Sequence, residues 1–162
     1  MITDDLRAFA AELPRVGALV GLDLGTKTIG VAMSDGLRSV ATPMETVKRK
    51  KFTLDAQALL KIFASRDTCG IVLGLPRNMD GSEGPRAQST RAFARNLAGL
   101  TPLPMLFWDE RLSTVAAERA LLEADTSRAK RGEVIDHVAA GFILQGVLDG
   151  LRHIASEGRD DD

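Results

Sequence analysis

The sequence predicts an α/β protein whose mixed five-stranded sheet is flanked by helices. Two observations lead to this prediction. Short apolar segments near the N-terminus are separated by turn residues, and later apolar segments alternate with segments of helical periodicity. Strands joined by short turns pair in antiparallel fashion, whereas strands joined through helices pair in parallel. We therefore expect the first three strands to be antiparallel, in a sheet of order 3-2-1-4-5.

The N-terminal half is predicted to supply a leading helix, three strands and a second helix. Apolar residues recur at helical spacing before Pro14, and a turn of Gly25, Thr26 and Lys27 separates two apolar strands into a hairpin. Pro43 places the third strand at an edge of the sheet, because proline lacks a ladder donor. The expected elements are a helix over 4–13, strands over 18–24, 28–34 and 40–47, and a helix over 53–65.

The C-terminal half is predicted to alternate strands and helices. The continuous apolar run 70–75 is typical of a strand that is covered on both faces, and a loop rich in Gly, Pro, Asn and Asp follows it. The other expected elements are helices over 86–98, 114–123 and 133–151 and a strand over 104–108. We expect three regions: a helical arm over 1–16, one folded domain over 17–152 and a disordered acidic tail over 153–162.

Composition is typical of a globular protein, with 44% hydrophobic and 27% charged residues in a chain of 162. The single cysteine, Cys69, excludes an intrachain disulfide and is expected to be a buried, inert thiol. The sequence contains no targeting segment and no apolar run of the length that a membrane span requires. We therefore expect a cytoplasmic protein without a membrane partner.

Basic residues gather in two places, although the formal net charge is only −1. One is the run Lys48, Arg49, Lys50 and Lys51, and the other comprises Arg128, Lys130 and Arg131. A basic run is usually a solvated face, but two of them favour a surface that binds phosphate groups.

Three acids stand at positions that favour a metal site. Asp23 lies inside an apolar strand, where a carboxylate is costly unless it is paired or binds a cation. Glu110 follows the strand 104–108, and because side chains alternate, only one of Asp109 and Glu110 can face the same way as Asp23. Asp136 is expected to open the last helix, where the helix dipole would also favour an acid.

The predicted ligand set of Asp23, Glu110 and Asp136 indicates a hard cation. Oxygen-only ligation selects Mg²⁺ (or Mn²⁺) over Zn²⁺. Such ions can activate the attacking water and stabilise the leaving oxygen of a phosphodiester, so no side-chain nucleophile is needed. Capping of a turn or of a helix remains the structural alternative for each acid, and Asp109 remains a possible helper.

Four motifs carry a resemblance to a known family. Residues 21–27 (GLDLGTK) with 30–35 (GVAMSD), 74–88 (GLPRNMDGSEGPRAQ), 109–114 (DERLST) and 135–140 (IDHVAA) resemble the signatures of the YqgF/RuvX family, in the family order. The resemblance covers about residues 17–150. Arg77 and Trp108 depart from the family pattern, which commonly has an apolar residue and an aromatic such as Tyr at these positions.

The resemblance implies an RNase H-like fold related to Holliday junction resolvases, and a nuclease that matures the 5′ end of pre-16S rRNA. It places the acidic site on Asp23, Glu110 and Asp136, and it therefore favours Glu110 over Asp109 as the metal ligand. The implied partners are pre-16S rRNA and the ribosome or its precursor, with branched DNA as the alternative. The sequence leaves open whether the protein is a monomer or a homodimer.

Further positions are candidates for nucleic-acid contacts, each with a solvated or capping role as the alternative. Polar side chains of a glycine-rich loop can lie along a nucleic-acid backbone, and basic side chains near the acids can contact phosphate groups. His137 and His153 are expected to be non-catalytic. The candidates are Lys27, Arg77, Asn78, Arg86, Arg111, Lys130, Arg131 and the run Lys48, Arg49, Lys50 and Lys51.

Three alternative functions remain open. A sugar kinase or actin-like ATPase shares the Gly-x-Asp-x-Gly-Thr hairpin but needs two such domains, and this chain has room for one. A DNA junction resolvase would use the same chemistry and is expected to act as a symmetric dimer, because it cuts two strands. A non-catalytic RNA-binding assembly factor would not need to keep all three acids.

Overall fold

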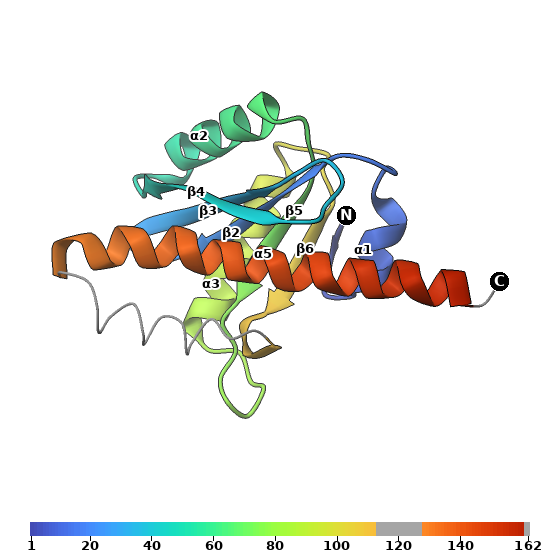
Figure 1. Cartoon of the computed structure of the whole chain (residues 1–162). Helices are drawn as coiled ribbons and strands as arrows, with labels where there is room; N and C mark the ends of the chain where they lie inside the picture. Colours follow the sequence, from blue (N-terminus) through green and yellow to red (C-terminus); the bar gives the residue numbers. More distant parts are fainter. Residues whose placement is uncertain (113–127, 161–162) are drawn as a thin grey trace.

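The computed structural model describes the backbone of residues 1–112 and 128–160 and the side chains of residues 1–112 and 137–157. Its centre is a six-stranded sheet of order β1-β6-β5-β2-β3-β4 (Figure 1). The strands are β1 (Ile2–Thr3), β2 (Ala18–Leu24), β3 (Thr28–Ser34), β4 (Ala41–Lys48), β5 (Thr68–Leu75) and β6 (Met105–Asp109).

The predicted order of five strands is confirmed. Strands β2, β3 and β4 are antiparallel neighbours, and β2, β5 and β6 are parallel neighbours. The sixth strand, β1, was not predicted: Ile2 pairs with Met105 and Thr3 with Leu106 at the far edge. Two residues are too few to give an alternating pattern, so only the tertiary pairing reveals this strand.

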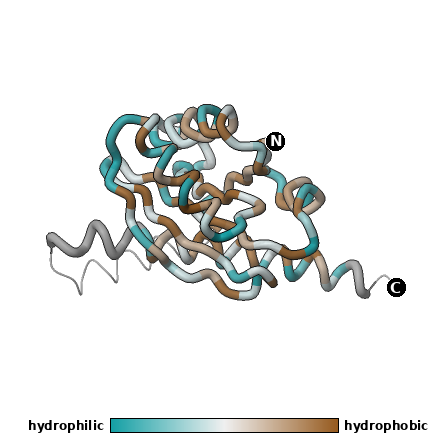
Figure 2. Tube along the Cα trace, turned by 90° about the horizontal axis from the view of Figure 1, so that it is seen from above, coloured by the Kyte–Doolittle hydropathy of each residue, from teal (hydrophilic) through white to brown (hydrophobic). Residues whose placement is uncertain are grey.

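Helices cover both faces of the sheet. The helices are α1 (Leu6–Glu12), α2 (Phe52–Ser65), α3 (Pro85–Ala98) and α5 (Arg128–Asp160), and a short 3₁₀ turn, η1 (Glu110–Leu112), follows β6. One apolar cluster joins the sheet to α2 and α3, and the other joins it to α1 and α5. Helix α5 runs across its face of the sheet, and apolar segments of the chain gather in the interior (Figures 1 and 2). Strands β2, β3 and β5 are therefore buried on both faces, whereas the edge strand β4 is partly exposed.

Small residues let α5 lie close to the sheet. A Cβ atom on Gly21 of β2 would stand 2.8 Å from Cβ of Leu144 and 3.0 Å from the carbonyl oxygen of Ala140. A side chain at this position would push the helix away, because both of these neighbours belong to the rigid part of α5. Gly21 therefore sets the distance between α5 and the segment of β2 that carries Asp23.

The last helix is longer than the sequence analysis expects. Helix α5 continues to Asp160 where a disordered tail from residue 153 is expected. Glu157 explains part of the extension, since it pairs with Arg7 of α1 and with His153, one turn away. The helix also begins at Arg128, so Asp136 lies more than two turns inside it and does not open it. The helix-dipole explanation for Asp136 is therefore wrong, since the dipole acts within the first turn.

The helix expected over 114–123 lies outside the described residues. No helix in the described part of the chain is both long and apolar enough to cross a membrane.

Candidate active site

The candidate active site lies at the carboxyl edge of the parallel strands. Strands β2, β5 and β6 run in the same direction, so their carboxyl ends meet at one edge of the sheet. In α/β sheets this edge is where ligands bind. Asp23 stands near the end of β2, Gly74 near the end of β5, and Glu110 directly after β6.

Asp23 is buried, with only 2% of its surface exposed. The alternation along β2 directs it to the face covered by α5, since Leu19 of the same phase belongs to the α5 cluster and Leu22 to the opposite one. A carboxylate so deeply buried requires charge or hydrogen-bond partners. Asp23 does take part in polar interactions in the structure.

Glu110 turns to the same face as Asp23. Its Oε1 atom lies 2.8 Å from the position that a Cβ atom on Gly74 would occupy, and Ile143 of α5 borders the same spot. The parallel register pairs Leu22 with Leu73, so the next position along β5, Gly74, lies beside Asp23. Glu110 and Asp23 therefore both flank Gly74 on the α5 face.

Gly74 leaves the space that Glu110 occupies, which gives a testable consequence. A Cβ atom at this position would lie 2.5 Å from Cδ1 of Ile143 as well as 2.8 Å from Glu110. We expect Gly74→Ala to lower the free energy of unfolding by about 1–3 kcal/mol through overpacking. We expect it also to slow nucleic-acid cleavage by about 100-fold, because the carboxylate is displaced. Urea unfolding and single-turnover cleavage measure the two effects.

Gly36→Ala is the matched control for Gly74→Ala. Its Cβ would meet only Cγ1 of Val16, at an ordinary 3.6 Å. Cleavage by Gly74→Ala at the wild-type rate would contradict the placement of Glu110 at the reacting centre.

Asp109 faces the opposite side of the sheet and is paired. Both carboxylate oxygens bind the Arg111 guanidinium, with 2.7 Å between Nη2 and Oδ2, and Oδ1 also accepts from the Arg111 backbone N–H at 2.9 Å. The hydrogen bond from Arg111 is the main reason that the pKa of Asp109 lies below its usual range. Asp109 is therefore an ionised partner of Arg111 on the other face of the sheet from Asp23.

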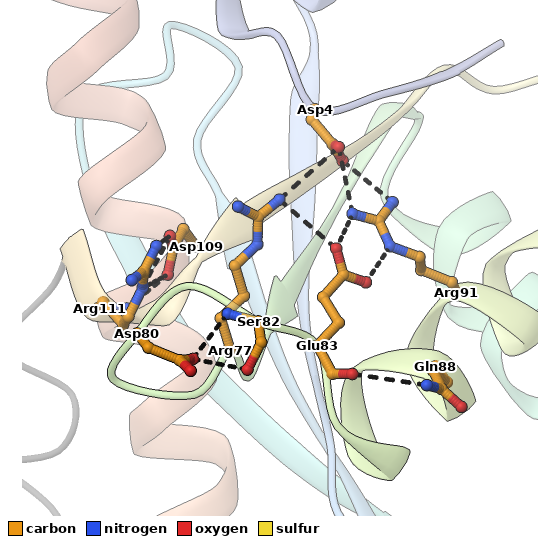
Figure 3. Close-up of polar contacts among 9 residues, drawn as sticks. All are labelled: Asp4, Arg77, Asp80, Ser82, Glu83, Gln88, Arg91, Asp109 and Arg111. Atoms are coloured by element: carbon orange, nitrogen blue, oxygen red, sulfur yellow. Dashed lines mark hydrogen bonds and ion pairs between the residues drawn. The ribbon is translucent and has the colours of Figure 1, made fainter.

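A network of four charged residues holds the loop between β5 and α3 (Figure 3). Arg91 of α3 binds Glu83 through two hydrogen bonds of 2.5 and 2.8 Å and also reaches Asp4, 3.2 Å away. Arg77 lies 3.8 Å from Asp4 and 3.7 Å from Glu83. The bond from Arg91 lowers the pKa of Glu83, while Glu83 and Asp4 raise the pKa of Arg91. Arg77 and Arg91 therefore share two carboxylates, which balance their two charges.

The tip of the same loop is closed by its own polar side chains (Figure 3). The Ser82 backbone N–H and hydroxyl both donate to Asp80 Oδ1, at 2.9 and 2.6 Å, and this lowers the pKa of Asp80. The Asn78 amide donates to the Ser82 hydroxyl oxygen at 3.0 Å, and Gly81 adopts a φ of 89° that favours glycine. In this structure Asn78 therefore stabilises the turn of the loop.

The remaining cationic candidates whose side chains the structure describes fall into two groups. Lys27, Lys48 and Lys51 are exposed, and among the described residues none of them has an ion-pair partner. Arg49, Lys50 and Arg86 line one pocket beside the end of β2. The structure thus separates residues that the sequence presents as one basic run. The side chains of Lys130 and Arg131 lie outside the described residues.

The two described acids on the α5 face fit a hard divalent cation in chemistry, because both offer carboxylate oxygens. Within the described side chains no group of three or more His, Cys, Asp or Glu residues could hold a metal. The third predicted ligand, Asp136, has its backbone in α5, one turn before Ala140, and its side chain lies outside the described residues. His137 contacts Thr46, with 3.2 Å between Nδ1 and Oγ1, on the β4 side of the helix.

Sequence reasoning missed two features of this site. One is the role of Asp4, Glu83 and Arg91 in holding the β5–α3 loop, since only the fold brings the N-terminus to α3. The other is Gly74, which leaves room for Glu110. A glycine inside an apolar strand is a signal of close approach and could have indicated the second feature.

Comparison with known proteins places the chain among a large set of relatives. A protein from Paracoccus denitrificans (strain Pd 1222) is 73% identical over 154 residues, which cover 95% of this chain and 98% of the relative. One from Ruegeria sp. (strain TM1040) is 72% identical over 156 residues, covering 96% and 99%. Both carry the description "Putative pre-16S rRNA nuclease".

Solved structures with the same fold include two resolvases. The complex "T. thermophilus RuvC in complex with Holliday junction substrate" has a TM-score of 0.52 at 11% identity and covers 85% of this chain and 96% of that one. The yeast mitochondrial Holliday junction resolvase Ydc2 has a TM-score of 0.50 at 13% identity, with coverages of 97% and 90%. At these identities the likeness concerns the fold alone, and it confirms the predicted RNase H-like architecture.

The family resemblance noted in the sequence is also confirmed. The model of the family described as "RuvX: Holliday junction resolvase" matches residues 17–150, which include β2 through most of α5. Together with relatives that are more than 70% identical over almost the whole chain, this match shows that the protein belongs to the RuvX family.

Proposed function

We propose that this protein is a Mg²⁺-dependent nuclease that hydrolyses phosphodiester bonds during 5′-end maturation of pre-16S rRNA. The observation that carries the proposal is the pairing of Asp23 and Glu110 around Gly74, on one face of the carboxyl edge. Asp136 is proposed as the third ligand, from the family motif at residues 135–140.

The carboxylates account for the chemistry in the following way. Asp23 and Glu110 supply hard oxygen ligands at a strand end and in a following turn; Asp23 is buried, and Glu110 is bordered by Gly74 and Ile143. When bound, Mg²⁺ (or Mn²⁺) would supply the acidity that activates water and the positive charge that stabilises the leaving oxygen. Asp23 and Glu110 would hold the cation, and the neighbouring α5 limits access of bulk solvent from that side.

The substrate is proposed from the relatives. Those that are more than 70% identical carry the description of a pre-16S rRNA nuclease, and on this basis we favour the ribosomal precursor, in the bacterial cytoplasm, as the partner. The family description favours a second candidate, a four-way DNA junction. A resolvase, which cuts two strands of a junction, would be expected to act as a symmetric homodimer.

Cleavage assays on both substrates test the proposal. The purified protein is incubated with a 5′-labelled pre-16S rRNA leader and with a labelled four-way DNA junction, each with Mg²⁺ or with EDTA. We expect the leader to be cut only in Mg²⁺ and the junction to remain intact. If only the DNA junction is cut, the result would favour the resolvase alternative over the rRNA nuclease. Failure to cut either substrate would contradict the nuclease proposal.

A further inference from the structure

A concave site lies on the opposite side of the β2 end from Asp23. It is a pocket of about 450 Å³ between the end of β2, the segment after β4 and the start of α3. Three cationic side chains line it, Arg49, Lys50 and Arg86, together with the hydroxyl-bearing residues Thr26 and Ser89. No carboxylate is among the described residues that line it.

Within the described part of the chain the three cations lack acidic partners, unlike three arginines near the active site. Arg77, Arg91 and Arg111 are each paired with a carboxylate. For Arg49, Lys50 and Arg86, the described part of the structure contains no ion pair. Three like charges that converge on one hollow raise its positive potential, and an anion bound there would relieve their repulsion.

The arginines are held in place by neutral groups. The Arg49 guanidinium donates to the carbonyl oxygen of Gly25 at 2.6 Å, and its Cζ atom lies 5.6 Å from the centroid of the Phe93 ring. Arg86 donates to the carbonyl oxygen of Leu24 at 3.4 Å. An arginine carries five N–H donors, so one such anchor leaves others for a ligand. Both side chains are thus fixed without loss of their charge.

The backbone of the basic segment is fixed as well. Asp55 in the first turn of α2 is only 2% exposed and accepts a hydrogen bond of 2.9 Å from the backbone N–H of Lys50. This bond holds the chain where it turns from β4 into α2. Within the basic run 48–51, Arg49 and Lys50 line the pocket, whereas Lys48 and Lys51 do not.

We propose that this pocket binds a phosphate group of the nucleic-acid backbone next to the strand segment that is cut. Planar guanidinium groups match phosphate oxygens, and the hydroxyls of Thr26 and Ser89 add donors of the same kind. Leu24 and Gly25, whose carbonyls anchor the two arginines, directly follow Asp23 along the chain. A nucleic-acid strand across the carboxyl edge would therefore reach the acids on one side and the pocket on the other.

That the bound phosphate belongs to a nucleic acid rests on the proposed function. RNA binding is measured without cleavage, so the test of the pocket does not depend on nuclease activity. Affinity for a fluorescent single-stranded RNA is measured in EDTA at several salt concentrations. The wild type is compared with Lys50→Gln/Arg86→Gln, which changes two exposed side chains. Because the pocket is proposed to hold one phosphate group, loss of this contact on a single strand should reduce the salt slope by about 0.7. At 0.1 M salt this corresponds to a loss in affinity of roughly 5-fold.

The double variant Arg66→Gln/Arg95→Gln is the matched control. It removes the same charge from two exposed arginines that do not line the pocket. We expect its RNA affinity to stay within about twofold of the wild type. Its salt slope should change by less than about 0.7, the value for one phosphate contact. Equal effects of the two double variants, or no effect of either, would overturn the proposal.

Inorganic phosphate distinguishes a nucleic-acid phosphate from a free one. It is titrated against the bound RNA at constant ionic strength, with the wild type and with Lys50→Gln/Arg86→Gln. We expect phosphate below 1 mM to displace no RNA from either protein. Displacement from the wild type alone would show that the pocket is built for free phosphate and would overturn the assignment to the backbone. If the wild type binds RNA as expected but does not cleave it in the separate cleavage assay, the result would count against the nuclease proposal only.

Discussion

Asp23→Asn is expected to reduce cleavage of the precursor RNA by at least about 100-fold while the protein keeps its fold. Loss of a residue that merely orients a metal ligand costs 10- to 100-fold, and loss of a ligand should cost at least as much. Asparagine has nearly the shape of aspartate, but it removes the charge and replaces one acceptor oxygen with an NH₂ donor, at a position that is 2% exposed. Asp23 takes part in polar interactions, and the amide keeps one acceptor oxygen for them, so we expect the variant to remain folded and to unfold cooperatively in EDTA. Single-turnover cleavage and thermal unfolding measure the two quantities.

Asp55→Asn is the matched control for Asp23→Asn. Asp55 is an equally buried aspartate, but it belongs to α2, and its Oδ1 accepts a backbone hydrogen bond that asparagine can still accept. At saturating RNA we expect Asp55→Asn to cleave within a fewfold of the wild type. If Asp23→Asn cleaves as fast as this control, Asp23 has no part in the chemistry.

Glu110→Gln is expected to have the second large effect, a loss of cleavage of at least about 100-fold, for the same reason. The neighbouring Asp109→Asn should leave cleavage nearly unchanged. The structure places the two acids on opposite faces: Oε1 of Glu110 borders Gly74, whereas Asp109 binds Arg111. The two variants therefore change neighbouring acids in the same way, and only the one on the α5 face is expected to lose cleavage.

Asp109→Asn also reports on the ion pair with Arg111. That pair is partly exposed, and pairs of this kind stabilise the fold by about 1 kcal/mol or less. We therefore expect only a small decrease in the free energy of unfolding, measured in urea. A larger loss of cleavage in Asp109→Asn than in Glu110→Gln would reverse the assignment of the two faces.

The fold could be predicted from the sequence almost completely, because its strands follow the apolar pattern closely. The runs 18–24 and 70–75 are buried on both faces, and the pairs β2–β3, β3–β4 and β5–β6 are neighbours both along the chain and in the sheet. Strand β1 and the C-terminal extension of α5 depend on contacts between distant segments, Ile2 with Met105 and Arg7 with Glu157. Local periodicity carries no signal for such contacts.

The candidate site could be predicted in part. The burial of Asp23 follows from the strand around it, and the alternation predicts that Asp109 and Glu110 diverge. Which of them shares the face of Asp23 depends on how β6 is registered against β5, which the sequence alone does not define. The basic candidates illustrate the same limit: Arg77 and Arg111 turn out to be paired, whereas Arg49 and Arg86 meet in a pocket although 36 residues separate them.

Binding of Mn²⁺ tests the central claim, that Asp23 and Glu110 hold a divalent cation at this edge, most directly. Electron paramagnetic resonance counts free and bound Mn²⁺ during a titration in the presence of a non-hydrolysable RNA oligonucleotide. We expect the wild type and Asp109→Asn to bind Mn²⁺ with similar affinity, and Asp23→Asn and Glu110→Gln to bind it at least about 10-fold more weakly. Equal affinity in all four proteins would contradict the metal site.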